Sequence, residues 1–444
     1  MSKNLVINGG SRTVPEGLQK SWPPINQDDI DAVVAVMKTG VLWGPMEEQV
    51  VGLQEDFARY IGAKHALVVN SGTAALHAAV VAAGIGPGDE VITPAYSFWA
   101  TAQAVLAHNG IPVFTDIDPD SMNMDPAKIE EKITERTRAL MPVHVHGLCA
   151  DMDPINDIAR KYNLRVIEDA AQAAGAKYKG KSAGVIGDVA GFSLNGSKNL
   201  PAGEGGIVTT NDDEMMDRAR KMAMFGEKVV PKGEIRLYDA QIMGFNYRNN
   251  EMADALCRSF LKRYDVLQEG RHKICNYLNE ELGKIKGIRV PEVPEGYVHS
   301  WHLYKLRLFP EELGITDMHV KRFRWAVHKA LVEEGVDMFE WHNMPVPAQS
   351  IFRSKDAYGK GEPWTGAHTS PQARDMVYDP FDYPVCVDMF DRSFCIEPIY
   401  PPNDLELMQY IVEAFHKVFD NLDAVLEFAK SITFPTMPGE NRKI

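Results

Sequence analysis

Short runs of β-branched and apolar residues alternate with longer helical stretches between residues 65 and 169. The expected strands are HALVVN (65–70), GDEVITP (88–94), IPVFTDI (111–117), RALMPVHV (138–145) and LRVIED (164–169). Helices are expected at TAALHAAVVAAG (73–84) and near residues 98–108, 127–133 and 152–162. Strands that alternate with helices in this way form βαβ units, in which neighbouring strands run parallel. The sequence therefore predicts an α/β fold in which helices flank a mostly parallel, mixed sheet.

The sequence after about residue 270 predicts a second, smaller α/β domain. It contains the expected strand HLYKLRLF (302–309), the expected helix DMHVKRFRWAVHKALVEEG (317–335) and a closing helix around residues 405–429. Residues 340–400 are rich in proline and aromatic residues and are expected to be largely loops. A chain of 444 residues is long enough for two domains. We therefore divide it into a large domain, residues 1–270, and a small C-terminal domain, residues 271–444.

Composition argues against several classes of partner. The net charge of −14, from 47 basic and 61 acidic residues, disfavours binding to nucleic acid. The five cysteines form no CxxC pair, and His144 and His146 alone are too few ligands for a metal site. The chain has neither a signal-peptide core nor an apolar run of about 18 residues. We expect a cytoplasmic protein without nucleic-acid, membrane or metal partners.

The segment GAKYKGKS (175–182) fits the phosphate-binding pattern G-x-x-x-x-G-K-[ST]. A functional P-loop follows directly on a strand and opens into a helix, which aims backbone N–H groups at the phosphate. Here the nearest expected strand ends at Asp169, and the following AGVIGDVAG contains three glycines. Each glycine costs about 1 kcal/mol in a helix relative to alanine. The segment is therefore expected to be an exposed, lysine-bearing hairpin or loop.

A more favourable anion site is predicted at VVNSGTAALHAA (68–79), where a strand leads into a strong helix. Ser71 and Thr73 are favourable at a helix N-terminus, and Gly72 allows the backbone to approach a ligand. The first N–H groups and the dipole of such a helix favour a phosphate. An ordinary capped helix is the simpler interpretation of these residues taken alone.

Three further positions add chemistry to this anion site. Lys198 stands in the glycine-bracketed loop FSLNGSKNLPAGEGG, where an amine can form a Schiff base with a carbonyl cofactor. Asp169 ends a strand, and pyridoxal phosphate needs such a carboxylate for its pyridinium nitrogen. Phe98, just after another expected strand, could lie against a flat ring. Taken singly, such a lysine is usually solvated, such an aspartate is as often a helix cap, and such an aromatic is more often part of the core.

Together these elements resemble fold-type I pyridoxal phosphate enzymes, and specifically the DegT/DnrJ/StrS family of sugar aminotransferases. The similarity extends over most of the chain, through NSGTAAL, GPGDEVITPAYSFWAT, MPVHVHG, VIEDAAQAAGA, FSLNGSKN, GEGGIVTTND, GFNYR and IEPIYPPND. The resemblance implies that Lys198 binds the cofactor covalently, that Asp169 meets the pyridine nitrogen and that Gln172 approaches the ring hydroxyl. It also implies a phosphate site at Gly72, Thr73 and Ser193, a stacking ring at Phe98, and Asn246, or alternatively Arg248, reaching the neighbouring subunit's site in a homodimer.

The resemblance implies a ping-pong aminotransferase that takes an amino group from glutamate or glutamine and gives it to a keto sugar. INGGSRTVPEG, SWPP and WHNMPVPAQSIFRS are closer to members that aminate keto-cyclitols such as scyllo-inosose. A nucleotide-diphosphate-linked keto sugar is the alternative acceptor. A nonenzymatic protein that binds pyridoxal phosphate is the alternative of a different class. Tyr96 and His342 are candidate substrate contacts, and His302 is expected to be structural.

Overall fold

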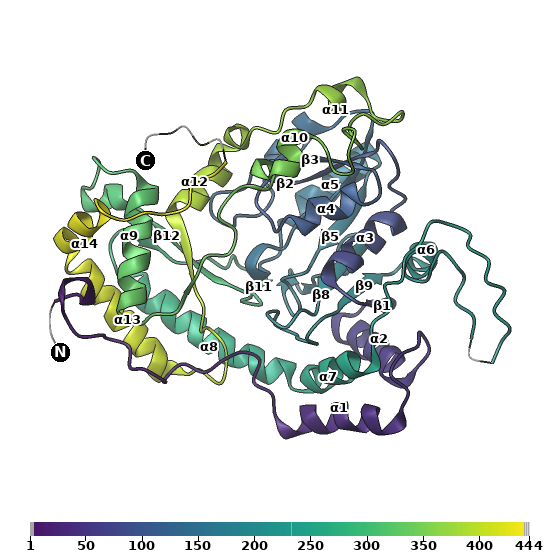
Figure 1. The fold of residues 1–444 in the computed structure, drawn as a ribbon, viewed down its shortest axis with the longest axis horizontal. Coiled ribbons are helices and arrows are strands. Elements are labelled where there is room, and N and C mark those ends of the chain that lie inside the picture. Colours follow the sequence, from purple (N-terminus) through teal and green to yellow (C-terminus); the bar gives the residue numbers. More distant parts are fainter. Residues whose placement is uncertain (1–3, 232, 439, 441, 443) are drawn as a thin grey trace.

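The computed structural model describes residues 4–231, 233–438, 440, 442 and 444. A seven-stranded sheet in the order β1-β9-β8-β5-β4-β2-β3 forms the centre of the large domain (Figure 1). The strands are β1 (His65–Val69), β2 (Glu90–Pro94), β3 (Ile111–Thr115), β4 (Thr137–Leu140), β5 (Arg165–Asp169), β8 (Val189–Ser193) and β9 (Gly206–Thr210). Strands β3, β2, β4, β5 and β8 are parallel, whereas β9 runs antiparallel to both β8 and β1. The predicted α/β fold with a mixed, mostly parallel sheet is confirmed.

Helices cover both faces of this sheet, as buried apolar strands require. The flanking helices are α2 (Glu48–Ile61), α3 (Gly72–Ala82), α4 (Ala100–Leu106), α5 (Met152–Tyr162), α6 (Asp213–Ala223) and α7 (Glu251–Lys262). Ile92 of β2 belongs to a core cluster with residues of α2 and α5, and its neighbour Val91 belongs to one with residues of α3 and α6. Adjacent strand residues thus point to opposite faces. Helix α1 (Gln27–Thr39) packs on α7 at the outside (Figure 1).

The single helix expected near residues 127–133 is not formed. Two 3-10 turns, η2 (Pro126–Lys128) and η3 (Glu130–Lys132), occupy the segment, and Ile133 returns to an extended conformation. Only Ile129 is fully buried there. A stretch of about seven residues is too short to form a stable helix without an apolar face to bury.

The small domain is built on a four-stranded antiparallel sheet in the order β10-β12-β14-β13. Its strands are β10 (Ile288–Arg289), β12 (Tyr304–Leu308), β14 (Ser393–Ile396) and β13 (Met338–Phe339). The main helices around it are α8 (Tyr264–Leu282), α9 (Val320–Glu333), α12 (Pro384–Arg392), α13 (Leu405–Phe419) and α14 (Leu422–Ala429). The closing helix expected around residues 405–429 is therefore two helices that meet at Asp420 and Asn421. Short helices and turns interrupt the loops between β13 and β14: η6 (Val346–Ala348), α10 (Ser350–Ser354), α11 (Pro371–Asp375) and η7 (Pro380–Asp382).

Helix α8 and the N-terminal segment connect the two domains. Helix α8 passes through residue 270 without a break. The segment that begins with η1 (Val6–Asn8) packs on the small domain, where Leu5 and Val14 are part of its core. The division at residue 270 stays a prediction, and the N-terminal segment lies with the C-terminal half of the chain.

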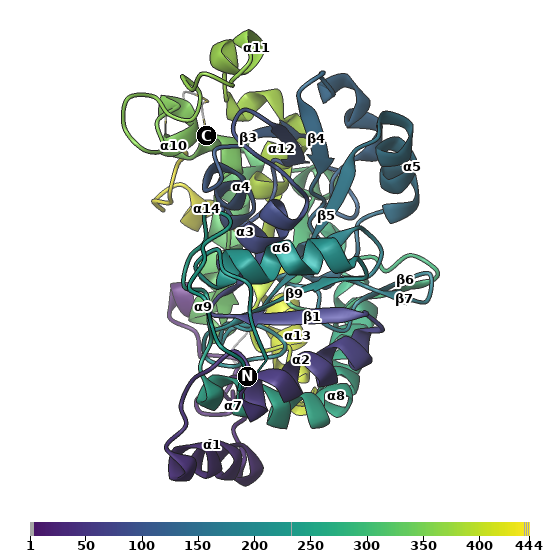
Figure 2. The same ribbon diagram turned by 90° about the vertical axis from the view of Figure 1, so that its right-hand side faces the viewer.

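GAKYKGKS forms a hairpin, as its sequence predicts. Strand β6 (Lys177–Tyr178) pairs antiparallel with β7 (Lys181–Ser182), and β6 also pairs with β11 (Tyr297–Val298). The two residues of the turn, Lys179 and Gly180, have φ angles of 47° and 82°, which a type I′ hairpin turn requires. The hairpin lies at the edge of the molecule (Figure 2). The next element in the described chain is strand β8 and not a helix, so the hairpin lacks the architecture of a P-loop.

Membrane spans, metal ligands and cysteines were considered in the sequence, and the structure bears on each of them. None of the helices in the described part of the chain is long and apolar enough to cross a bilayer. Within the same described residues, no cluster of three or more His, Cys, Asp or Glu side chains is arranged to hold a metal ion. All five cysteines are buried and unpaired.

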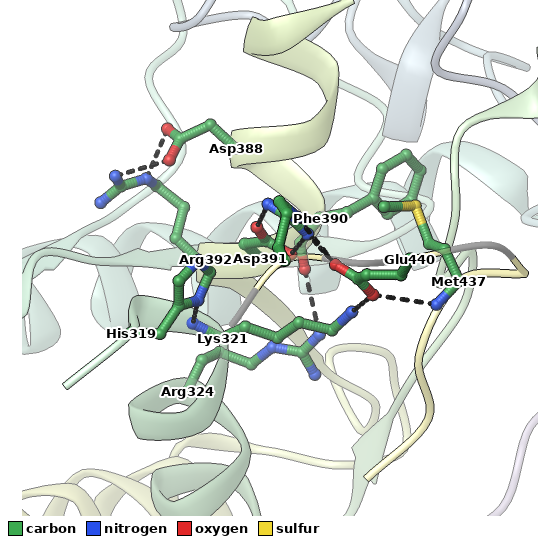
Figure 3. Close-up of polar contacts among 10 residues, drawn as sticks. His319, Lys321, Arg324, Asp388, Phe390, Asp391, Arg392, Met437 and Glu440 are labelled. Atoms are coloured by element: carbon green, nitrogen blue, oxygen red, sulfur yellow. Dashed lines mark hydrogen bonds and ion pairs between the residues drawn. The ribbon is translucent and has the colours of Figure 1, made fainter. Parts of the chain in front are cut away.

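The C-terminal tail is attached to α9 and α12 through buried charges (Figure 3). The Lys321 amine lies 2.7 Å from the Glu440 carboxylate, and their side chains are 4% and 1% exposed. Glu440 also accepts a hydrogen bond from the backbone N–H of Met437. Arg442 pairs with Asp391 of α12 at 2.6 Å. Burial alone would raise the pKa of Glu440, but hydrogen bonds from Lys321, Met437 and Arg442 hold it below its ordinary value.

We expect the substitution Glu440→Gln to lower the free energy of unfolding by about 1–3 kcal/mol, since it removes the charge that compensates buried Lys321. The wild-type contribution should disappear as the pH falls through the depressed pKa of Glu440, because protonation has the same effect as the substitution. Urea unfolding at neutral and acidic pH measures both effects. Glu427→Gln is the matched control, because its ion pair with Lys430 is 74% and 68% exposed and should contribute little. Equal losses in the two variants would contradict the prediction.

Candidate active site

A cavity of about 690 Å³ opens at the carboxyl ends of β5 and β8, where α/β folds bind ligands. Seven of the eight predicted site residues line it: Gly72, Thr73, Phe98, Asp169, Gln172, Ser193 and Lys198. They come from four segments of the large domain: the start of α3, the β2–α4 loop, the end of β5 with its turn, and the end of β8 with the loop that follows. The fold thus brings together residues up to 126 positions apart, from Gly72 to Lys198, because parallel strands end at one edge of the sheet.

One end of the cavity has the features of a phosphate site. Gly72 and Thr73 open helix α3, and the hydroxyl of Ser71 accepts a hydrogen bond from the N–H of Ala74. The first N–H groups of a helix have no partners within it and attract anions. A Cβ atom added at Gly72 would lie 2.6 Å from Cβ of Ser193. Only glycine therefore leaves room where α3 meets the end of β8.

Asp169 is held in place from two sides at the end of β5. Its Oδ2 accepts a hydrogen bond of 2.7 Å from the Thr101 hydroxyl, and its Oδ1 accepts one of 3.1 Å from the N–H of Ala171. Burial raises the pKa of this carboxyl, although the hydrogen bonds and the charge of Lys198 act in the opposite direction. A cationic ring nitrogen placed beside Asp169 would restore its preference for the ionised form.

Gln172 has a fixed amide orientation. Its Oε1 accepts a hydrogen bond of 2.7 Å from the backbone N–H of His146. With Oε1 bound in this way, Gln172 offers its Nε2 donors to a ligand oxygen. Phe98, 41% exposed, lies on the wall of the same cavity between β2 and α4.

Lys198 lies in the loop after β8 and is 9% exposed. Its backbone N–H donates to the carbonyl of Asn195, and its carbonyl accepts from the indole N–H of Trp22, so the backbone of Lys198 is held on both sides. Burial lowers the pKa of the amine to about 7, against the opposing effect of the Asp169 charge. A substantial share of the amine is therefore neutral near pH 7, as a nucleophile or a base requires.

The small domain contributes five residues to the cavity wall, and the sequence alone did not place them together. Arg271, His302, Trp341, Glu397 and Tyr400 line the cavity. Nε2 of His302, expected to be structural, lies 3.4 Å from Nζ of Lys198. The motifs IEPIYPPND and WHNMPVPAQSIFRS contain Glu397, Tyr400 and Trp341, but the approach of these side chains to the cavity depends on the packing of the small domain.

The other candidate residues do not line this cavity among the described residues. Tyr96 is fully buried and does not line the cavity among the described residues, and its hydroxyl lies 3.2 Å from Nε2 of His146. His342 also stays behind the wall, stacked on Trp341. His144 pairs with Glu168 at 2.8 Å. Asn246 lies outside the cavity of its own protomer, where its side-chain oxygen accepts a hydrogen bond from Arg248.

Comparisons with known proteins agree on one family. Residues 23–411 match the model of the DegT/DnrJ/EryC1/StrS aminotransferase family. A Micromonospora echinospora protein, named as a candidate L-glutamine:3-amino-2,3-dideoxy-scyllo-inosose aminotransferase, is 33% identical over 96% of this chain and 99% of its own. GDP-perosamine synthase of Caulobacter vibrioides is 41% identical over 64% of this chain and 76% of its own.

A solved structure of similar fold contains the expected cofactor type. NtdA from Bacillus subtilis, with bound cofactor PMP, has a TM-score of 0.74 and 25% identity, and the match covers 92% of this chain and 86% of that one. The present cavity fits such a group, since it combines a helix N-terminus, a buried carboxylate and a buried amine at different points of its wall.

We expect Lys198→Met to stabilise the cofactor-free protein by up to about 5 kcal/mol below pH 7. Burial of the ammonium penalises the folded state there, whereas the unfolded chain keeps its proton up to the ordinary pKa of 10.5. The difference between variant and wild type should shrink as the pH rises from about 7 to 10.5, because the folded wild type then holds a neutral amine. Urea unfolding at several pH values, at one protein concentration, measures this difference. A difference that stays constant with pH would show that the amine is solvated.

Proposed function

Because the chain belongs to the DegT/DnrJ/EryC1/StrS aminotransferase family, and is thus a pyridoxal phosphate-dependent sugar aminotransferase, we propose that it aminates a keto-cyclitol of the scyllo-inosose type or a related free keto sugar. Glutamate or glutamine is the proposed donor. The observation that carries the assignment of roles is the buried Lys198, whose pKa is lowered to about 7 in a cavity that it shares with Asp169.

Each predicted residue has a proposed task. When bound, pyridoxal phosphate supplies a reactive aldehyde and an electron sink. Lys198 would hold the cofactor through its amine, and when free its Nζ would take the proton from Cα of the donor. Asp169 would pair with the ring nitrogen, and Nε2 of Gln172 would donate to the ring hydroxyl. Gly72, Thr73 and Ser193 would hold the phosphate, and Phe98 would lie against the ring.

The charges of the cavity support an acceptor without a nucleotide. A diphosphate is usually recognised by several arginines or lysines. Lys177, Lys179 and Lys181 lie on the β6–β7 hairpin, and neither they nor Arg248 and Lys305 line the cavity formed by the described residues. Its cationic side chains are Lys198 and Arg271, and Arg271 is already bound to Asn199 and the carbonyl of Trp301. The Micromonospora relative, whose name includes a scyllo-inosose, matches nearly the full length.

A nucleotide-linked keto sugar is the second candidate. The higher identity to GDP-perosamine synthase, 41% over 64% of the chain, favours it. A nonenzymatic cofactor-binding protein is disfavoured by the presence of Lys198, Asp169 and Gln172 in one cavity. A cytoplasmic location is also proposed, and the five unpaired cysteines support it.

We further propose a homodimer in which each subunit completes the other's site with Asn246. The segment after α6 extends away from the body of the protomer (Figure 1), and its Ile235, Leu237 and Met243 are 85%, 84% and 68% exposed. Trp43 nearby is 61% exposed beside the guanidinium of Arg248. Such exposed apolar side chains support the proposal that a second copy covers this surface.

The first test is the visible absorption of the protein with pyridoxal phosphate. We expect a band from the covalent adduct that bleaches when L-glutamate or L-glutamine is added, because the amino group passes to the cofactor. Lys198→Ala should lack this donor-dependent change. Scyllo-inosose or a UDP-linked keto sugar, added to the bleached enzyme, should then restore the band and identify the acceptor class. A wild-type band that the donor leaves unchanged would refute the proposed function.

The shared site can be tested by mixing two inactive variants. Asn246→Asp should abolish activity, because its charge repels the phosphate, and Lys198→Ala removes the anchor. If Asn246 acts on the partner's site, heterodimers hold one intact site, and co-refolded equal mixtures should regain up to about a quarter of wild-type activity. Separately refolded variants are the control. Full activity in Asn246→Asp, or no recovery in the mixture, would contradict the arrangement.

A further inference from the structure

The short segment that follows β13 places an indole ring beside the reactive amine. β13 is an edge strand, paired with β14 through Met338 and Phe339. Beyond it, Trp341 turns toward the cavity, and His342 has a φ of 58°, a left-handed conformation that is uncommon for a residue with a side chain. The backbone thus adopts an unfavourable shape at the point where Trp341 enters the active site.

The segment is fixed from behind by a buried ion pair. Glu340 lies 2.9 Å from Arg324 of α9, and their side chains are 17% and 3% exposed. Arg324 also donates to the carbonyl of Phe390 on α12. Arg324 and Phe390 appear next to the tail contacts in Figure 3. The residue immediately before Trp341 is therefore anchored to two helices of the small domain.

Trp341 presents a ring face to the reaction centre. Nζ of Lys198 lies 4.3 Å from the ring centroid. His342 stacks on the indole at 4.5 Å with an interplanar angle of 20°, and His302 meets it edge-on at 5.0 Å. Phe98 is 6.1 Å away at an angle of 38°. The indole is thus supported by a second ring and forms a flat apolar wall next to the amine.

A ping-pong aminotransferase admits two different substrates to one site. The donor is an amino acid with carboxylates, which the negative face of an aromatic ring disfavours. A cyclic polyol has C–H groups on its ring faces, which carry partial positive charge and suit an aromatic face. The two substrates should therefore depend on Trp341 to different degrees.

We infer that Trp341 determines acceptor specificity by packing its indole face against the C–H face of a six-membered acceptor ring. This inference rests on the proposed function, since it assumes that the acceptor is such a ring. An alternative is that the indole only positions Lys198 or stabilises its charge. That role would affect both half-reactions equally, because Lys198 acts in each.

Two measurements on the holoenzyme separate these roles. The first is binding of myo-inositol, a cyclitol without a carbonyl group that cannot react, followed by saturation-transfer NMR of its ring protons. The second is the rate of the donor half-reaction, followed by bleaching of the visible band. Both are made on the wild type, Trp341→Ala and Trp341→Phe. Tyr162→Ala is the control, because Tyr162 is a partly exposed aromatic on α5, away from the cavity.

We expect Trp341→Ala to weaken myo-inositol binding about tenfold, which corresponds to about 1.4 kcal/mol. The donor half-reaction should change by less than about threefold. Trp341→Phe should retain much of the binding, since it keeps an aromatic face, and it also guards against misfolding of the alanine variant. Tyr162→Ala should resemble the wild type in both measurements.

Three results would overturn the inference: no saturation transfer to myo-inositol in the wild type, unchanged affinity in Trp341→Ala, or an equal loss in both measurements. The proposed function fails in a different way. In that case the donor does not bleach the band of the wild type, whatever the affinity for myo-inositol.

Discussion

The burial of one amine governs the arrangement of the active site. A lysine ammonium taken out of water is strongly destabilised unless nearby groups compensate it. Around Lys198 those groups are the carboxylate of Asp169 and the ring face of Trp341. Asp169 is itself held by Thr101 of α4 and by the N–H of Ala171 in the turn that follows β5. The chemistry of the amine thus depends on the relative positions of three strand ends and of the small domain.

This dependence explains why the cavity needs both domains. The large sheet supplies the groups proposed to hold the cofactor, on rigid strand and helix termini. The small domain supplies Arg271, His302 and Trp341, which close the cavity over the amine. A scaffold of this kind keeps the proposed cofactor-binding groups of the large domain constant, while the residues of the small domain contact different substrates. Family members with differently named sugars are compatible with such a separation.

Much of the large domain follows from local sequence, because alternating strands and helices allow one parallel architecture and bring Asp169 and Ser193 to a common edge. Gly72 and Lys198 were identified by motif as well as by position.

Trp341 and Arg271 could not be assigned, since their approach to Lys198 depends on packing between distant segments. The helix expected near residues 127–133 failed for a local reason, because so short a segment has little apolar surface to bury. Asn246 stays a prediction, since its proposed partner is another chain.

The packing of the N-terminal segment limits the order in which the two domains can fold. Leu5 and Val14 are synthesised long before Val425 and Ile432, yet all four residues pack in one core. Thr13 bonds Glu334, more than 300 positions later. The contacts of the N-terminal segment therefore stay incomplete until residues 425–432 have been synthesised. The large domain can therefore fold before the N-terminal segment has its packing partners. The small domain, whose core combines N-terminal and C-terminal residues, is completed last.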